Sequence, residues 1–519
     1  MQSSMSAPGR YYAAPRTVSG TRTGRTSVLR RLLLASMIAG MAFALFRTSP
    51  VPWLTRTMVT ALWVLCVIPL YRYLGQNPAF RRPIPFFPVL SLAFGLYYAL
   101  PLTLGIVDNY NNAPVFPETD YDLPVQLALL GWITMVGGYI VTGLLYPPRR
   151  PPRRVGWNPK LLSKVGFALM FGGLAVSALR SIFLSATIFG GMLQFILSLE
   201  WLGTGLLIVL ARRGELTKFQ KKALVIGFAV STAMLLSQGN IAPMAMYFAT
   251  GAFALWIARP YFRPRWIIGA VVAAILVVSF RGIIIDYRQE AWTRVQLSST
   301  ESLRLIIRLL GDRIEREGVA RTIGHGVAMT AGRSAIMDLF ANVARRTPYE
   351  VPYWKGDTYK SLVGSFVPRV IWPDKPTKDL GQGFGHRYAL IHQSNKSTAI
   401  NLPILVEFFL NFGGAGVIVG MLIVGIIYRV LDNAVNRPGQ SLLLSMIGLV
   451  ILLPLLLIES DFSLVLGGLP LTGAAFYVVW WQLGRALGGT TTATAAVMRG
   501  AARLRMAQLQ RPQLPAGNG

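Results

Sequence analysis

The sequence predicts an all-α polytopic membrane protein with about twelve transmembrane helices and one large extracytoplasmic loop. Hydrophobic residues make up 53% of the 519 residues and charged residues only 14%. The mean hydropathy is +0.48. Apolar runs long enough to cross about 30 Å of hydrocarbon recur from one end of the chain to the other. These properties exclude a soluble enzyme, a secreted disulfide scaffold and a disordered chain.

The apolar runs define the predicted spans. We expect them at 32–46, 57–74, 84–107, 123–146, 161–180, 189–211, 223–239, 241–258, 266–285, 401–428, 441–458 and 463–483. The basic stretch Arg10 to Arg31, followed by the short run 32–46, has an alternative interpretation as a cleaved signal peptide. Cleavage there would break an alternation of sides that is otherwise consistent.

The basic residues predict the orientation. With a cytoplasmic amino terminus, the inside segments are 1–31, 72–83, 147–164, 212–222, 259–265, 429–440 and 484–519. They hold 30 of the 51 Lys and Arg residues and only two acids, Glu215 and Asp432. This is the positive-inside pattern, so we expect both termini to be cytoplasmic. It also explains the net charge of +30 better than a nucleic-acid partner does, because the basic residues are dispersed.

One long segment breaks the pattern. We divide the chain into a basic cytoplasmic tail (1–31), nine transmembrane helices (32–285), a periplasmic loop (286–400), three more helices (401–483) and a second cytoplasmic tail (484–519). The loop holds eleven acids and all three histidines. Helical periodicity predicts two amphipathic helices that lie on the membrane surface or cap the bundle. Their apolar residues are Leu303, Ile306, Ile307, Leu310 and Ile314, then Ile336, Leu339, Phe340 and Val343.

Aromatic, proline and basic residues interleave between Tyr353 and Pro376. The prolines restrict the backbone to extended and turn conformations. Such a stretch can present Arg369 and Lys375 at little ordering cost. The Trp and Tyr rings suit two roles, a face for a sugar ring or an anchor at the bilayer interface, and the sequence leaves both open.

Three stretches in and after this region carry a family resemblance. They are Val367-Pro-Arg-Val-Ile-Trp-Pro-Asp-Lys-Pro376, Gly381-Gln-Gly-Phe-Gly385 and Pro403-Ile-Leu-Val-Glu-Phe-Phe-Leu-Asn-Phe-Gly413. Together they resemble the Wzy-type O-antigen or oligosaccharide repeat-unit polymerases of bacteria. The nine preceding spans resemble that family only in number and spacing.

The resemblance implies a C-type glycosyltransferase-like protein of the bacterial inner membrane. Its reaction would move a growing glycan from one undecaprenyl diphosphate to the sugar of another, at the periplasmic face and without a metal or cofactor. The product would be an O-antigen, capsule or exopolysaccharide. The implied partners are lipid-linked donor and acceptor, membrane lipids, a chain-length regulator and a flippase. An O-antigen ligase-type transferase and a transporter or flippase for lipid-linked oligosaccharides stay open as alternatives.

Basic residues are the predicted ligands of the lipid diphosphate. A departing diphosphate needs its charge neutralised, and the planar guanidinium of arginine pairs with two phosphate oxygens at once. The candidates are Arg369, Lys375 and Arg387 in the loop, and Arg281 near the outer end of the ninth span.

The acceptor hydroxyl must lose a proton, so a base is also expected. His386, whose imidazole can accept a proton, adjoins Arg387, and Glu407 is an acid about two turns inside the tenth span. A structural partner for a nearby arginine is the alternative role of Glu407. The sequence contains no phosphate-binding glycine loop, zinc-spaced cluster or nucleophile elbow. Activation of the donor must therefore come from its lipid diphosphate.

Overall fold

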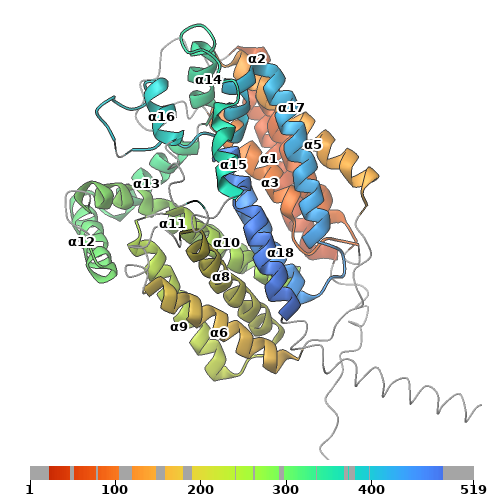
Figure 1. Ribbon diagram of the computed structural model, residues 1–519, viewed down its shortest axis with the longest axis vertical. Coiled ribbons are helices and arrows are strands. Elements are labelled where there is room, and N and C mark those ends of the chain that lie inside the picture. Colours follow the sequence, from red (N-terminus) through yellow and green to blue (C-terminus); the bar gives the residue numbers. More distant parts are fainter. Residues whose placement is uncertain are drawn as a thin grey trace, which may run out of the picture.

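The described part of the chain is all-helical, which confirms the predicted α class. The computed structural model describes residues 23–46, 52–77, 80–104, 120–147, 158–178, 190–239, 241–260, 264–291, 297–334, 336–366, 372, 380–396 and 398–482. Within these ranges there is no strand, and the long helices pack side by side (Figure 1).

Two groups of helices form the bundle. The first group contains α1 (Thr23–Phe46), α2 (Trp53–Gly75), α3 (Phe86–Tyr98), α4 (Leu100–Leu104), α5 (Asp122–Leu145) and α17 (Ile404–Val435). The second contains α6 (Pro159–Ala178), α8 (Gly190–Arg213), α9 (Lys218–Ser237), α10 (Ile241–Ala258) and α18 (Leu442–Leu452). The groups are joined by α18, which packs against α8 and α10 and also against α17.

Within the residues that the structure describes, seven helices are long and apolar enough to cross a membrane. They are Trp53–Gly75, Asp122–Leu145, Pro159–Ala178, Lys218–Ser237, Ile241–Ala258, Ile404–Val435 and Phe462–Gln482. Phe86–Tyr98 and Leu442–Leu456 are shorter apolar helices. The chain is therefore a multi-pass membrane protein by the length and composition of its helices, and the count of twelve spans stays a prediction.

Two predicted spans are interrupted at a proline. The run 84–107 is divided between α3 and α4, and Pro101 lacks the N–H that would bond to a carbonyl one turn earlier. The run 441–458 changes from α18 to the 3-10 helix η4 (Leu453–Leu456), which contains Pro454. In both places proline interrupts an apolar run that hydropathy alone reads as one span.

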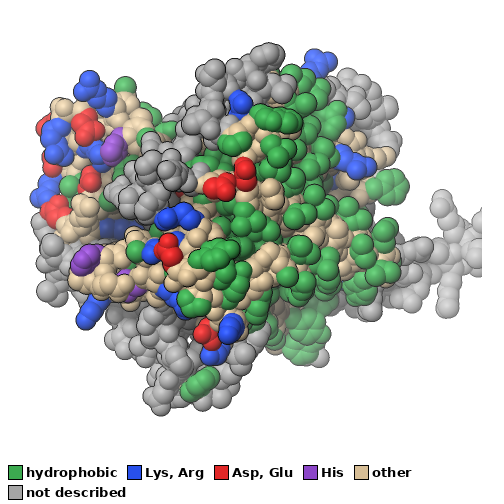
Figure 2. Space-filling model, turned by 90° about the horizontal axis from the view of Figure 1, so that it is seen from above, with side chains coloured by type: hydrophobic (Ala, Val, Ile, Leu, Met, Phe, Trp, Pro, Cys, Tyr) green, Lys and Arg blue, Asp and Glu red, His purple; other side chains and the backbone are tan. Residues whose placement is uncertain are grey.

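Apolar side chains remain exposed along the outside of the bundle. On α5 and α17 they include Leu130, Ile133, Ile140, Val141, Leu144, Ile418, Val419, Leu422, Ile423 and Ile426. Figure 2 shows apolar side chains over much of one face, with charged side chains and histidines gathered at the left of that view. An apolar flank of this kind suits contact with lipid tails.

The helices α5 and α17 approach each other closely. A Cβ atom at Gly138 would lie 2.4 Å from the Leu422 carbonyl oxygen, and one at Gly425 would lie 2.0 Å from the Met135 carbonyl oxygen. Only glycine fits at these two positions, so the two backbones approach as they do at small-residue contacts in membrane bundles.

Three helices form the first part of the loop. They are α12 (Ser299–Glu317), α13 (Val319–Ser334) and α14 (Ile336–Arg346), which follow α11 (Pro264–Ala291). Both predicted amphipathic helices are confirmed, and α14 caps the first group by packing on α3, α5 and α17. The predicted apolar face of α12 is confirmed at Ile306 and wrong at Ile307, which is 66% exposed, because the face against α11 includes Leu305 in its place. The sequence did not predict α13, which packs along α11.

In the later part of the loop, the described residues form short helices: η3 (Asp357–Tyr359), α15 (Lys360–Phe366) and α16 (Leu380–Arg387). The helix α19 (Phe462–Leu466) begins the last apolar stretch and packs against α15 and η3. These short helices lie together at one end of the first helix group.

The predicted tenth span is broken at Gly413, which has φ 65° and ψ −154° inside α17. The segment before the break folds back along the segment after it, since a Cβ atom at Gly420 would lie 2.4 Å from the Phe408 ring. Glu407 is therefore not two turns inside a continuous span. It lies in a short helical segment, Ile404–Phe412, that precedes the long one.

We predict that Gly413→Ala destabilises the protein. The backbone conformation of Gly413 is one that essentially only glycine adopts, so alanine should cost about 1–3 kcal/mol. A Cβ there would also lie 2.9 Å from the Tyr353 hydroxyl oxygen. The measurement is thermal unfolding in detergent. The matched control is Gly137→Ala in α5, where nothing lies within 4 Å of the added carbon. Equal stability of the two variants would contradict a forced reversal at Gly413.

Candidate functional site

The loop is anchored to the first segment of α17 by backbone bonds. The Trp354 N–H donates to the Leu410 carbonyl at 3.0 Å, and the Gly356 N–H donates to Oδ1 of Asn411 at 2.8 Å. We call Trp354, Thr358, Glu407, Asn411 and Phe462 the Glu407 cluster. It brings together residues of the loop, α17 and α19.

Asn411 is the central hydrogen-bonding residue of this cluster and is fully buried. Besides accepting from Gly356, its Nδ2 donates to Oγ1 of Thr358 at 2.9 Å and to the Glu407 carbonyl at 2.8 Å. One side chain therefore fixes the loop against a helix more than fifty residues away in sequence. Because the site is buried, losing these partners would leave polar groups unsatisfied.

The Glu407 carboxyl is enclosed, with 0% of the residue exposed. Its Oε2 accepts a hydrogen bond from the Phe462 N–H, at the start of α19, at 2.6 Å. This bond joins the first segment of α17 to the last apolar stretch of the chain. Because the carboxyl is enclosed, a sugar hydroxyl in bulk water does not reach it. The geometry therefore supports a role of Glu407 in positioning neighbouring parts of the chain.

Aromatic rings close the space beside Glu407. The Tyr359 ring centroid lies 6.2 Å from those of Phe408 and Phe412 and 6.0 Å from that of Phe462. Burial raises the pKa of the Tyr359 hydroxyl, and the charge of Glu407 raises it further. Tyr359 therefore stays protonated, and the loop meets the bundle through a mainly apolar contact.

Arg387 is the predicted ligand whose position is clearest. It ends α16, is exposed, and its guanidinium carbon lies 4.6 Å from the Trp354 ring centroid. Its Nη2 donates to the Pro352 carbonyl at 3.2 Å. Stacking on an aromatic face holds the planar cation while other N–H groups remain available to an anion.

His386 precedes Arg387 in the last turn of α16 and is partly buried. Its Nε2 lies 2.8 Å from the Asn395 carbonyl oxygen. A carbonyl only accepts, so Nε2 carries the proton in the neutral ring and Nδ1 has the lone pair. His392 is exposed and pairs with Ser394, with 2.7 Å between Nδ1 and Oγ.

The remaining predicted ligands are not brought to this place. Arg369 and Lys375 lie outside the described residues. Arg281 lies on α11, whose main described contacts are with α10, α12 and α13. Near it, Arg313 pairs with Asp286 at 2.9 Å. The described structure thus joins Arg387 to the Glu407 cluster through Trp354 and leaves Arg281 in a different part of the bundle.

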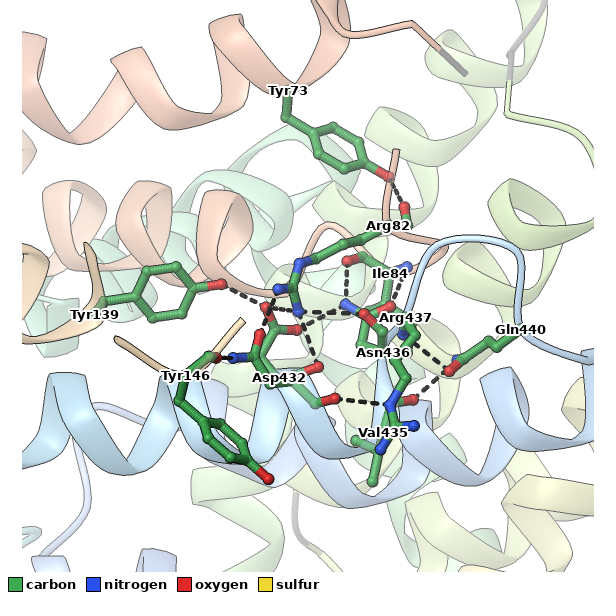
Figure 3. A network of polar contacts seen from close by, with 11 residues as sticks. Tyr73, Arg82, Ile84, Tyr139, Tyr146, Asp432, Val435, Asn436, Arg437 and Gln440 are labelled. Carbon is green, nitrogen blue, oxygen red and sulfur yellow. Dashed lines mark hydrogen bonds and ion pairs between the residues drawn. The ribbon is translucent and has the colours of Figure 1, made fainter. Parts of the chain in front are cut away.

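A second polar cluster, which the sequence did not predict, lies at the other end of α17 (Figure 3). We call Arg82, Tyr139, Asp432, Asn433 and Asn436 the Asp432 cluster. Nη1 of Arg82 lies 2.6 Å from Oδ2 of Asp432, which also accepts from the Tyr139 hydroxyl. Nδ2 of Asn436 donates to Oδ1 of Asp432 at 2.7 Å. The buried carboxylate is therefore surrounded by donors.

The same cluster ties α17 to two connecting segments. Nη2 of Arg82 donates to Oδ1 of Asn433 at 2.5 Å, and Nδ2 of Asn433 donates to the Tyr146 carbonyl at 2.5 Å. Asn436 exchanges two bonds with the Ile84 backbone, at 3.0 and 2.7 Å. In the sequence, this cluster is indicated only by the presence of Asp432, which is one of two acids in the predicted inside segments.

Comparisons with known proteins give one match. Residues 260–438 match a domain of unknown function, DUF8712. No curated protein and no solved structure matches the chain. The matched residues cover less than half of the chain, from the start of α11 to just beyond α17. They include the loop and the α17 residues of both polar clusters.

Removing the cation of the Asp432 cluster should destabilise the protein. We predict that Arg82→Gln costs about 3–5 kcal/mol, because it leaves a buried carboxylate without its ion-pair partner. The double variant Arg82→Gln with Asp432→Asn should recover part of that loss. Thermal unfolding in detergent measures both, with the exposed Lys221→Gln as the control. A single variant as stable as the control would show that the ion pair contributes little.

Proposed function

We propose that the protein is a membrane glycosyltransferase that polymerises undecaprenyl-diphosphate-linked oligosaccharide repeat units into a surface polysaccharide. The proposal rests on the resemblance carried by residues 367–413. The structural observation that supports it most is the exposed Arg387 guanidinium, stacked on Trp354 beside the first segment of α17. A fixed cation next to an aromatic face suits a ligand that combines phosphate and sugar.

The reaction requires three events. The acceptor sugar hydroxyl attacks the anomeric carbon of the donor, the bond from that carbon to the diphosphate oxygen breaks, and undecaprenyl diphosphate leaves. The hydroxyl proton passes to a base. Arg387 would stabilise the charge on the leaving diphosphate, together with Arg369 and Lys375 of the motif. No residue of the chain needs to form a covalent intermediate.

We assign the proton acceptor to His386 rather than to Glu407. The Nδ1 lone pair of His386 follows from its Nε2 bond to a carbonyl, and the imidazole is partly exposed. Glu407 would have a positioning role: its bond to the Phe462 N–H would hold α19 against the first segment of α17. Arg281 would contact a lipid headgroup at some distance from this site.

The proposed setting is the bacterial inner membrane, with twelve spans, both termini in the cytoplasm and the loop in the periplasm. Two observations support the placement of the predicted inside segments on the same side of the membrane. Arg30, near the start of α1, lies 4.3 Å from the Tyr71 ring centroid near the end of α2. Arg82, Arg213, Pro260 and Gln440 belong to four such segments and line one pocket.

Arg387→Ala should leave single lipid-linked repeats and few long chains in a strain that lacks the native protein. Loss of one preorganised donor is expected to slow polymerisation about a hundredfold. The same direction is expected for Arg369→Ala. Gel analysis of chain length measures the effect, at matched expression. The control is Arg316→Ala, an exposed arginine of α12 whose hydrogen bond among the described residues is to Asp312 of its own helix.

Other outcomes of that experiment would favour other functions. Unchanged chain lengths for Arg387→Ala would contradict the proposed diphosphate role. Repeats that accumulate on the cytoplasmic face would indicate a transporter or flippase. Long lipid-linked chains that are never transferred onward would indicate a ligase.

Two substitutions of Glu407 separate its possible roles. We predict that Glu407→Gln keeps long chains, because the glutamine oxygen can still accept from Phe462, whereas Glu407→Ala loses both stability and long chains. Chain length and thermal unfolding are measured together. Loss of polymerisation in a stable, normally expressed Glu407→Gln variant would make Glu407 the proton acceptor instead of His386.

A further inference from the structure

A pocket lies beside the Asp432 cluster, where the two helix groups meet. Its volume is about 200 Å³, roughly seven times the volume that one water molecule occupies in the liquid. It is formed by the end of α2, the segment before α3, the ends of α8 and α10, and the connection from α17 to α18. The function proposed above does not use it.

The charge of this pocket is positive. Arg81, Arg82 and Arg213 line it, and its described lining contains no Asp or Glu. Arg82 is neutralised by Asp432. The other two arginines have no carboxylate partner within the described residues, so the pocket has an uncompensated positive charge.

Arg81 is held rigidly. Its Nη2 donates to the Leu74 carbonyl at 3.0 Å and to the Gln76 carbonyl at 2.8 Å. Its guanidinium carbon lies 5.2 Å from the Tyr73 ring centroid and 5.9 Å from that of Trp256. Burial lowers the pKa of Arg81 because the charged form loses water. An anion in the pocket would offset that cost.

The aromatic wall is also fixed in place. Nε1 of Trp256 donates to the Tyr73 hydroxyl at 3.2 Å, and that hydroxyl donates to the Arg82 carbonyl at 2.7 Å. This network gives the pocket a preformed shape, near the ends of the apolar helices α2 and α10.

We propose that this pocket binds the phosphate of an anionic phospholipid headgroup from the leaflet on its own side. Arg81 and Arg213 would contact the phosphate, and the apolar lining residues Ile257 and Leu442 would contact the glycerol region. Basic pockets between transmembrane helices on the cytoplasmic side are typical sites for such headgroups. A lipid is favoured over free phosphate because the lining combines basic and apolar side chains, and because the volume of the pocket exceeds that of a bare anion.

A bound lipid would link the two helix groups. The pocket joins α2 and the α17–α18 connection to α8 and α10, which belong to different groups. Binding should therefore raise the stability of the whole bundle, by an amount that grows with the logarithm of the ligand concentration once that concentration exceeds Kd.

The test uses the full-length protein purified in a neutral detergent. Phosphatidylglycerol is titrated while thermal unfolding is followed, and native mass spectrometry counts the lipids that stay bound. Arg213→Gln is the informative variant, because Arg213 is exposed and has no hydrogen bond or ion pair among the described residues. Lys221→Gln, an exposed lysine of α9, is the matched control.

Phosphatidylglycerol should raise the unfolding temperature of the wild type and of Lys221→Gln. Its affinity for Arg213→Gln should be about fivefold weaker, the change expected for one cation near a membrane surface. Equal affinity for all three proteins would overturn the proposal. Equal stabilisation by phosphatidylcholine would also overturn it, because that result would mean that the pocket does not select an anionic lipid. Equal stabilisation by millimolar inorganic phosphate alone would overturn it as well, because that result would assign the pocket to a free ion.

Discussion

Buried polar groups in a membrane bundle must find their partners within the protein, and α17 meets this constraint at both of its ends. Asp432 is surrounded by Arg82, Tyr139 and Asn436, while Glu407 bonds to the Phe462 backbone. The stretch between the break and Asp432 rises by about 28 Å at 1.5 Å per residue, close to the hydrocarbon thickness. The segment before the break folds back, so Glu407 lies beside this stretch, and the two polar clusters occupy different levels along α17.

The two ends of the first helix group differ in what they present. At one end, His386 and Arg387 lie in the last turn of the short helix α16, and their side chains reach solvent. At the other end, Arg81 and Arg82 are folded into the bundle and bonded to backbone carbonyls. Exposed cations such as Arg387 suit a substrate that binds, reacts and leaves. Enclosed cations such as Arg81 suit a ligand that stays bound.

Much of the fold could be predicted because it depends on local patterns. Apolar runs gave the helices, and the spacing of Ile336, Leu339, Phe340 and Val343 gave the buried face of α14. The breaks at Pro101, Gly413 and Pro454 could not be read from hydropathy, which averages over the residues that interrupt a helix. In α12 the apolar residues extend round two faces, so periodicity did not decide which face is buried.

The site was less predictable because its contacts are distant in sequence. Arg387 and His386 were proposed from their residue types, and the role of Trp354 as the support for Arg387 needed the folded chain. Asn411 gave no signal, since an asparagine in an apolar segment does not reveal which loop it binds. Asp432 drew attention only as an acid among bases, and its partner Arg82 is 350 residues away.

The reversal at Gly413 has a mechanical consequence. Asn411, which fastens the loop through Gly356 and Thr358, stands only two residues before it. The membrane-crossing part of α17 starts directly after it. The conformation of Gly413 thus sets the direction in which the first segment of α17 turns back, and with it the place at which Trp354 and Gly356 of the loop are bound.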